Sequence, residues 1–136
     1  MDFRYTAEEE AFRKEVSGFL DKELPAGWLG IDPGPEEEYR PGMFEVAARM
    51  RRILGEKGWI GITWPKEYGG QGASIWKQVI VLQELAYRGA PGCDAAVAQG
   101  DLILRFGTDE QKKRFLPPIA RGEMKLTIGM SEPNAG

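Results

Sequence analysis

The sequence predicts an all-α domain, a helical up-and-down bundle of about five to six helices, with one β-strand after it. Three observations support this fold class. Apolar residues recur every three or four positions in several separate segments, which is the spacing of one helix face. Two of the expected helices begin with a capping box, Thr-x-x-Glu or Thr-x-x-Gln. After Gly122 the apolar residues instead recur at every second position, which is typical of a half-buried strand.

The first helix is expected to begin at Thr6, which forms a capping box with Glu9. Its apolar residues share one face: Phe12, Val16, Phe19 and Leu20. Pro25 ends this helix. Residues 25–42 contain four prolines, four glycines and the acidic run 36–38, a composition that predicts a long surface loop.

A second helix is expected over residues 43–54, where apolar residues again recur at helical spacing, and Gly58 is placed to end it in a left-handed conformation. Residues 58–72 then mix glycines with tryptophans and isoleucines. We expect an ordered loop with buried aromatic anchors. It contains three glycines within four positions, Gly69, Gly70 and Gly72.

The third helix, residues 75–86, is apolar on almost every side and is therefore expected to lie centrally in the bundle. A fourth, from about Cys93 to Phe106, places small residues ahead of bulky ones. Small side chains on a buried helix indicate either close packing or room for a ligand, and both interpretations stay open.

A short helix is expected from Thr108 to Phe115, where Pro117 and Pro118 interrupt it. The alternating segment 124–130 is the only expected strand, and a lone strand leaves its backbone donors and acceptors unpaired. We therefore expect a helical domain over residues 1–122. Residues 123–136 would be the first strand and turn of a β domain whose partner strands lie beyond this sequence.

Composition removes several classes of function. The 18 basic and 21 acidic residues give a net charge of −3 without a basic cluster, which argues against nucleic-acid binding. One cysteine and no histidine exclude an internal disulfide, Cys-based metal clusters and Ser-His or Cys-His catalysis, so no metal is expected. The first residues lack the apolar run of a signal peptide and no segment has the roughly 20 apolar residues of a membrane span, so the expected location is cytoplasmic.

Four features are candidates for chemistry, each with a plainer alternative. The glycine cluster matches no classical nucleotide loop. Glu84, in the apolar third helix, is either a pKa-shifted acid or a carboxylate that reaches solvent or an arginine. The basic run 112–114 either meets an anion or is a solvated helix face. Cys93 is either an activated thiol or a small filler residue. No catalytic group stands out from the residues alone.

Three motifs read together closely resemble the acyl-CoA dehydrogenase family. They are GWIGITWPKEYGGQG at 58–72, FGTDEQKKRFLP at 106–117 and MSEPNAG at 130–136, and their order and intervals also match. The Asp-Phe-x-x-Thr-x-Glu-Glu opening is similar as well. The resemblance therefore covers essentially the whole chain, from the family's N-terminus to the start of its middle domain.

The resemblance implies a flavoenzyme about three times this length, with an N-terminal helical domain, a middle β domain and a C-terminal four-helix domain. Such enzymes bind FAD and commonly form homotetramers. They oxidise an acyl-CoA to a trans-2-enoyl-CoA: a carboxylate takes the α proton, the β hydrogen leaves as hydride to the flavin, and electrons pass to an electron-transfer flavoprotein. Fatty acid metabolism is the implied setting.

The resemblance also implies roles for particular residues. The Ser-Glu-Pro-x-Ala-Gly motif begins the family's flavin contact, although the match stops before its final serine. The implied cofactor-binding residues are Ile128, Met130, Ser131 and Gly136. The fourth helix corresponds to a segment that lines the acyl tail. The implied substrate-lining residues are Asp94, Ala95, Ala98 and Leu102. The catalytic base belongs to the C-terminal domain, so the chain supplies none, and by itself it is expected to be inactive.

A second function remains open from the sequence. The chain could instead be a helical interaction module, or half of a split flavoprotein, that pairs its orphan strand with a partner chain. Most of the acyl pocket would lie outside this sequence, so the sequence does not fix the acyl chain length or distinguish a dehydrogenase from related oxidases or monooxygenases.

Overall fold

The computed structural model describes residues 4–28, 42–92, 94–126 and 134. Within them it is all-helical, with five α-helices and one short 3-10 helix, as expected. The elements are α1 (Ala7–Glu23), α3 (Met43–Glu56), η1 (Lys66–Tyr68), α4 (Ile75–Tyr87), α5 (Asp94–Phe106) and α6 (Asp109–Ala120).

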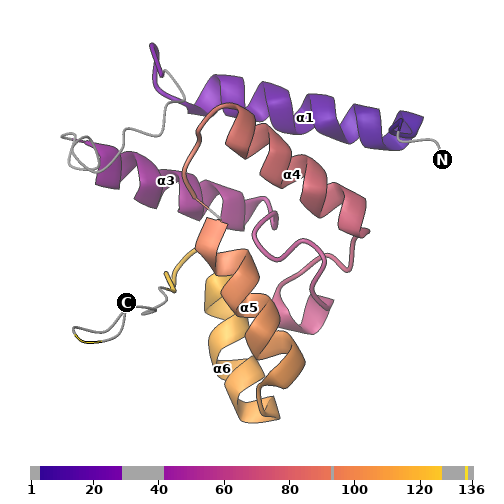
Figure 1. Cartoon of the computed structure of the whole chain (residues 1–136), viewed down its shortest axis with the longest axis vertical. Coiled ribbons are helices and arrows are strands. Elements are labelled where there is room, and N and C mark those ends of the chain that lie inside the picture. Colours follow the sequence, from indigo (N-terminus) through magenta and orange to yellow (C-terminus); the bar gives the residue numbers. More distant parts are fainter. Residues whose placement is uncertain (1–3, 29–41, 93, 127–133, 135–136) are drawn as a thin grey trace.

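Two pairs of helices form the framework (Figure 1). Helices α1 and α4 lie side by side and run in the same direction, with α3 running the opposite way. Helices α5 and α6 form an antiparallel pair that extends away from the other three, and η1 packs against α6. The first three helices therefore alternate in direction, α5 and α6 alternate with each other, and the all-helical fold is confirmed.

One hydrophobic core joins these elements. Val16 and Leu20 of α1 are fully buried, and α3, α4, α6 and the loop before η1 add the rest. Those other members are Met50, Leu54, Trp59, Ile60, Ile62, Trp64, Ile80, Val81, Leu85, Leu116, Ile119 and Ala120. The two tryptophans are 4% and 0% exposed. The prediction of an ordered loop anchored by buried aromatic residues is therefore confirmed.

Both predicted capping boxes are present. The Thr6 hydroxyl accepts a hydrogen bond from the Glu9 amide at 3.2 Å, and the Glu9 carboxylate accepts one from the Thr6 amide at 2.7 Å. Thr108 and Gln111 make the same pair of bonds at the start of α6. Each box satisfies two backbone donors that the first helical turn would otherwise leave unpaired.

The expected end of the last helix at Phe115 is wrong, because α6 continues through Pro117 and Pro118 to Ala120. Its last turn is held by packing, since Leu116, Ile119 and Ala120 are buried. The Pro117 carbonyl also accepts from the Arg121 amide at 3.1 Å. Tertiary burial thus outweighs the two donors that proline removes.

Two other predictions need qualification. The α4 helix is buried through Ile80, Val81 and Leu85, but Ile75 and Trp76 are 61% and 51% exposed, so it is not buried on almost every side. Residues 127–130 of the expected strand lie outside the described residues, and 124–126 carry no regular secondary structure. None of the helices among the described residues is long and apolar enough to span a bilayer.

Candidate functional site

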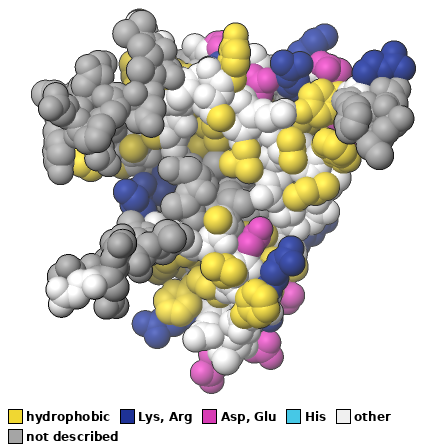
Figure 2. Space-filling model, in the orientation of Figure 1, with side chains coloured by type: hydrophobic (Ala, Val, Ile, Leu, Met, Phe, Trp, Pro, Cys, Tyr) yellow, Lys and Arg dark blue, Asp and Glu magenta, His cyan; other side chains and the backbone are white. Residues whose placement is uncertain are grey.

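A stripe of apolar residues on the outer side of α5 is the first candidate site. Ala98, Leu102 and Phe106 follow one another at intervals of four, which places them on one helix face. Ala98 is exposed, and Leu102 and Phe106 are 57% and 80% exposed. Figure 2, a view of one face of the molecule, shows hydrophobic side chains at the surface in the region of α5 and α6. We call these three residues the α5 stripe.

Two of the four predicted substrate-lining residues, Ala98 and Leu102, lie on this stripe. Asp94 and Ala95 lie in the first turn of α5, and their side chains are outside the described part of the chain. Sequence reasoning did not assign Phe106, although its interval of four from Leu102 was a usable signal. The predicted cofactor-binding residues Ile128, Met130, Ser131 and Gly136 all lie outside the described residues.

The inner side of α5 rests on Trp64, which comes from the loop before η1. The indole Nε1 donates a hydrogen bond to Asp101 Oδ1 at 2.7 Å. A Cβ atom built on Gly100 would lie 2.2 Å from Cζ2 of the same ring, so only glycine allows this approach. Gln99, beside the stripe, is 9% exposed, and among the described residues its Oε1 is a buried acceptor without a hydrogen-bond donor.

The glycine cluster serves the same loop. A Cβ on Gly70 would lie 2.1 Å from the Trp64 carbonyl oxygen, and that carbonyl accepts from the Gly72 amide at 2.9 Å. The cluster therefore lets the chain fold closely around Trp64. This packing role agrees with the absence of a classical nucleotide-loop pattern in the sequence.

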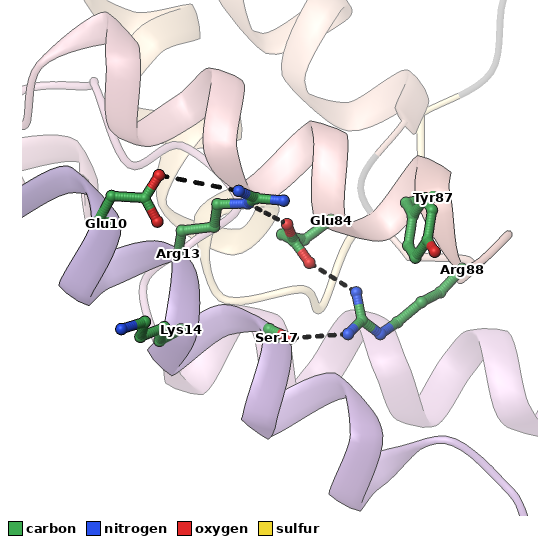
Figure 3. Close-up of a pocket in the computed structure, with 7 residues that line it drawn as sticks. All are labelled: Glu10, Arg13, Lys14, Ser17, Glu84, Tyr87 and Arg88. Carbon is green, nitrogen blue, oxygen red and sulfur yellow. Dashed lines mark hydrogen bonds and ion pairs between the residues drawn. The ribbon is translucent and has the colours of Figure 1, made fainter. Parts of the chain in front are cut away.

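The second candidate is an ionic cluster between α1 and α4 (Figure 3). The side chain of Glu84 is 8% exposed. Its Oε1 accepts from Arg13 Nε at 2.8 Å, and its Oε2 accepts from Arg88 Nη1 at 2.6 Å. Arg88 also donates to Asp21 at 2.8 Å and to the Ser17 hydroxyl at 2.7 Å. These groups border a cavity of about 310 Å³, lined by Glu10, Arg13, Lys14, Ser17, Glu84, Tyr87 and Arg88.

This cluster holds Glu84 in its charged form. Burial alone would raise the pKa of Glu84, but hydrogen bonds and charge from Arg13 and Arg88 outweigh it and bring the pKa below its ordinary value. A carboxylate so held is a poor proton donor at neutral pH. The prediction that Glu84 reaches an arginine is confirmed. The pKa of Glu84 is also shifted, but downward, which favours a charged partner of the arginines over a proton-donating acid.

The remaining candidates show no built site. Lys113 and Arg114 are exposed on α6, and the Arg114 guanidinium lies 5.0 Å from the centre of the Phe115 ring. This is a solvated helix face, as the plainer interpretation expects. Cys93 lies outside the described residues. Of the two well-formed regions, only the α5 stripe presents apolar surface that a ligand or another part of a protein can cover.

Known proteins show strong similarity to this chain. The family model for the N-terminal domain of acyl-CoA dehydrogenases matches residues 6–123. Acyl-CoA dehydrogenase FadE26 of Mycobacterium tuberculosis is 36% identical over 137 residues, which cover 100% of this chain and 34% of that protein. The chain thus spans about one third of the length of the relatives it matches.

Solved structures agree. The ChsE4-ChsE5 complex from Mycobacterium tuberculosis contains a chain of 36% identity that superposes with a TM-score of 0.79, covering 100% of this chain and 33% of that one. A structure described as the Tcur3481-Tcur3483 steroid ACAD gives 35% identity and a TM-score of 0.79, covering 100% and 34%. The fold and these matches define the chain as a helical domain of the kind found at the N-terminus of acyl-CoA dehydrogenases. The chain belongs to the acyl-CoA dehydrogenase family.

Proposed function

We propose that this chain is the N-terminal portion of a flavin-dependent enzyme that oxidises an acyl-CoA to a trans-2-enoyl-CoA. Residues 1–122 would be its helical domain, and residues 123–136 would begin the middle β domain. The chain supplies no catalytic base in this proposal, and we expect it to be inactive alone. Its contribution is to bind and orient the acyl group.

The α5 stripe is the observation that carries this proposal. An exposed apolar face of three residues on a helix that is firmly backed by Trp64 is suited to cover an acyl chain. Each methylene removed from water there contributes about 0.8 kcal/mol. Asp94 and Ala95, one turn earlier in α5, would extend the contact toward the other end of the acyl group.

FAD is the expected cofactor, and when bound it supplies a two-electron acceptor for the substrate's β hydrogen. Ser131, with backbone amides up to Gly136, would hydrogen-bond the flavin ring, and Ile128 and Met130 would flank it. Replacing Ser131 by Ala in the full-length protein removes one hydrogen bond, about 1 kcal/mol, and should weaken flavin retention. Unchanged flavin content in that variant would remove Ser131 from this role.

The wider assignments are also proposals. An electron-transfer flavoprotein is the expected electron acceptor, the cytoplasm the expected location, and fatty acid metabolism the expected setting. A homotetramer is the expected assembly. The similarity to a two-component complex and to a protein described as a steroid ACAD supports a second possibility, a mixed assembly acting on a steroid CoA ester.

The test uses the purified full-length protein under anaerobic conditions. We expect a yellow protein whose flavin absorbance bleaches on addition of an acyl-CoA, with one equivalent of the enoyl-CoA formed. The substrates should include C4 to C16 straight chains and a steroid side-chain CoA ester. The 136-residue chain alone should be colourless. A reading frame that ends at Gly136, together with a partner chain that pairs with residues 124–130, would instead favour the interaction module or split flavoprotein.

A further inference from the structure

Trp64 is enclosed more tightly than a core tryptophan requires. Its side chain is fully buried, and glycines from three different segments approach it. A Cβ on Gly61 would lie 2.4 Å from the ring, one on Gly100 2.2 Å from the ring, and one on Gly70 2.1 Å from the Trp64 carbonyl. Any of these side chains would force Trp64 or its neighbour to move. The indole is therefore confined by two glycines, Gly61 and Gly100, and the Trp64 backbone by a third, Gly70.

The same indole contacts α5 in two ways. Its benzo edge meets the backbone at Gly100, which fixes how closely the helix approaches the loop. Its N–H donates to Asp101 at 2.7 Å, which fixes the rotation of the helix about its own axis. A buried indole N–H needs such an acceptor, because an unpaired donor costs about 1–3 kcal/mol.

The first of these contacts lies on the side of α5 opposite the stripe, and the second lies on its flank. At 3.6 residues per turn, Gly100 points about 160° and Asp101 about 100° away from the common direction of Ala98, Leu102 and Phe106. A shift or rotation imposed by Trp64 is therefore transmitted directly to the stripe, because the helix between them is rigid.

We propose that Trp64 is a positioning residue that sets acyl-chain specificity by fixing the depth and rotation of α5 through Gly100 and Asp101. This rests on the proposed function, in which the stripe lines the acyl group. Trp64 itself touches no substrate. The indole of Trp64 fixes the position of α5 and therefore of the stripe. The position of the stripe in turn determines how much of the acyl chain it covers.

The experiment compares four variants of the full-length holoenzyme. Trp64→Phe removes the N–H and part of the ring, and Asp101→Leu removes the acceptor. Asp101→Asn is the conservative control, because its amide oxygen still accepts from the indole. Trp59→Phe is the matched control, because Trp59 is 4% exposed but packs against Phe12 and Phe19 of α1.

Two readouts are measured for each variant: kcat/KM across C4 to C16 acyl-CoA esters, and hydrogen exchange of the amides in residues 98–106. We expect Trp64→Phe and Asp101→Leu to change the ratio of long-chain to short-chain kcat/KM by about fourfold or more, the value of one methylene contact. Exchange in α5 should rise in both. Asp101→Asn and Trp59→Phe should keep the wild-type ratio and the wild-type exchange.

The proposal is overturned if kcat/KM falls equally at every chain length, or if exchange in α5 is the same in Trp64→Phe as in Trp59→Phe. Failure of the proposed function looks different: the wild-type holoenzyme would then turn over none of the esters. In that case the exchange data still decide whether Trp64 and Asp101 position α5, and unchanged exchange would refute it.

Discussion

The α1–α4 interface and the outer face of α5 treat their side chains in opposite ways. Between α1 and α4, the charged Glu84 is buried and is matched by two arginines. On α5, apolar groups are exposed, and Leu102 and Phe106 have no cover among the described residues. The comparison suggests different roles for the two regions. The charged side chains between α1 and α4 pair with one another and hold the two helices together, whereas the apolar residues of the α5 stripe support the proposed function.

The two regions also differ in how fully their polar groups are hydrogen-bonded. In the ionic cluster each of the three guanidinium nitrogens of Arg88 donates to an acceptor: Asp21, Glu84 and Ser17. Nothing further needs to bind there for the charges to be satisfied. Beside the α5 stripe, in contrast, the buried Oε1 of Gln99 has no donor among the described residues. Exposed apolar residues along one helix face are typical of a surface that another group covers.

The largest expected effect is a difference in stability between variants of two arginines, Arg88 and Arg105. Arg88→Met should lower the free energy of unfolding by about 3 kcal/mol, because Glu84 loses a partner inside a buried cluster. Arg105→Met is the matched control: Arg105 is exposed on α5, and its loss should change stability by less than about 0.5 kcal/mol. Thermal melts of the two full-length variants measure the difference, and equal values would contradict the account.

A smaller effect is expected on how stability depends on pH in the acid range. Because the folded state lowers the pKa of Glu84 below its ordinary value of 4.5, the stabilisation is fully present above that pH. It is lost as pH falls further, through the folded-state pKa. Urea midpoints of the wild type should therefore decline below pH 4.5 more steeply than those of Glu84→Gln, which has no proton to gain there. Parallel profiles from pH 7 to pH 3 would show that Glu84 is not held in its charged form.

The smallest stability effect is expected on the α5 stripe. Leu102→Ser should change the free energy of unfolding by less than about 0.5 kcal/mol, since its side chain is already 57% exposed. Leu85→Ala, on the buried side of α4, should cost about 3 kcal/mol. Chemical unfolding of both variants checks this contrast. A large loss in Leu102→Ser would mean that the stripe is part of a core.

Local features of the fold could be predicted from the sequence. The capping boxes at Thr6 and Thr108 need only residues three positions apart, and helix periodicity needs only one segment at a time. The end of α6 could not be predicted in this way. Proline content favours an early end, but the burial of Ile119 and Ala120 against other helices decides the outcome.

The same distinction applies to the site. Ala98 and Leu102 were found because a resemblance pointed to their helix and a spacing of four joins them. The contact of Trp64 with Asp101 spans 37 positions, and that of Arg13 with Glu84 spans 71. No periodic pattern within one element signals either pair. Long-range polar contacts of this kind are visible only once the helices are packed.

The central claim, that the α5 stripe lines the acyl chain, is tested most directly by Ala98→Leu in the full-length protein. The measurement is kcat/KM across a series of acyl-CoA lengths, paired with a thermal melt. Because Ala98 is exposed in this domain, the added atoms should occupy ligand space and leave Tm nearly unchanged. Shortening the site by two carbons should lower the long-chain to short-chain ratio about tenfold. A uniform fall at every length, accompanied by a lower Tm, would contradict the claim and make Ala98 an ordinary packing residue.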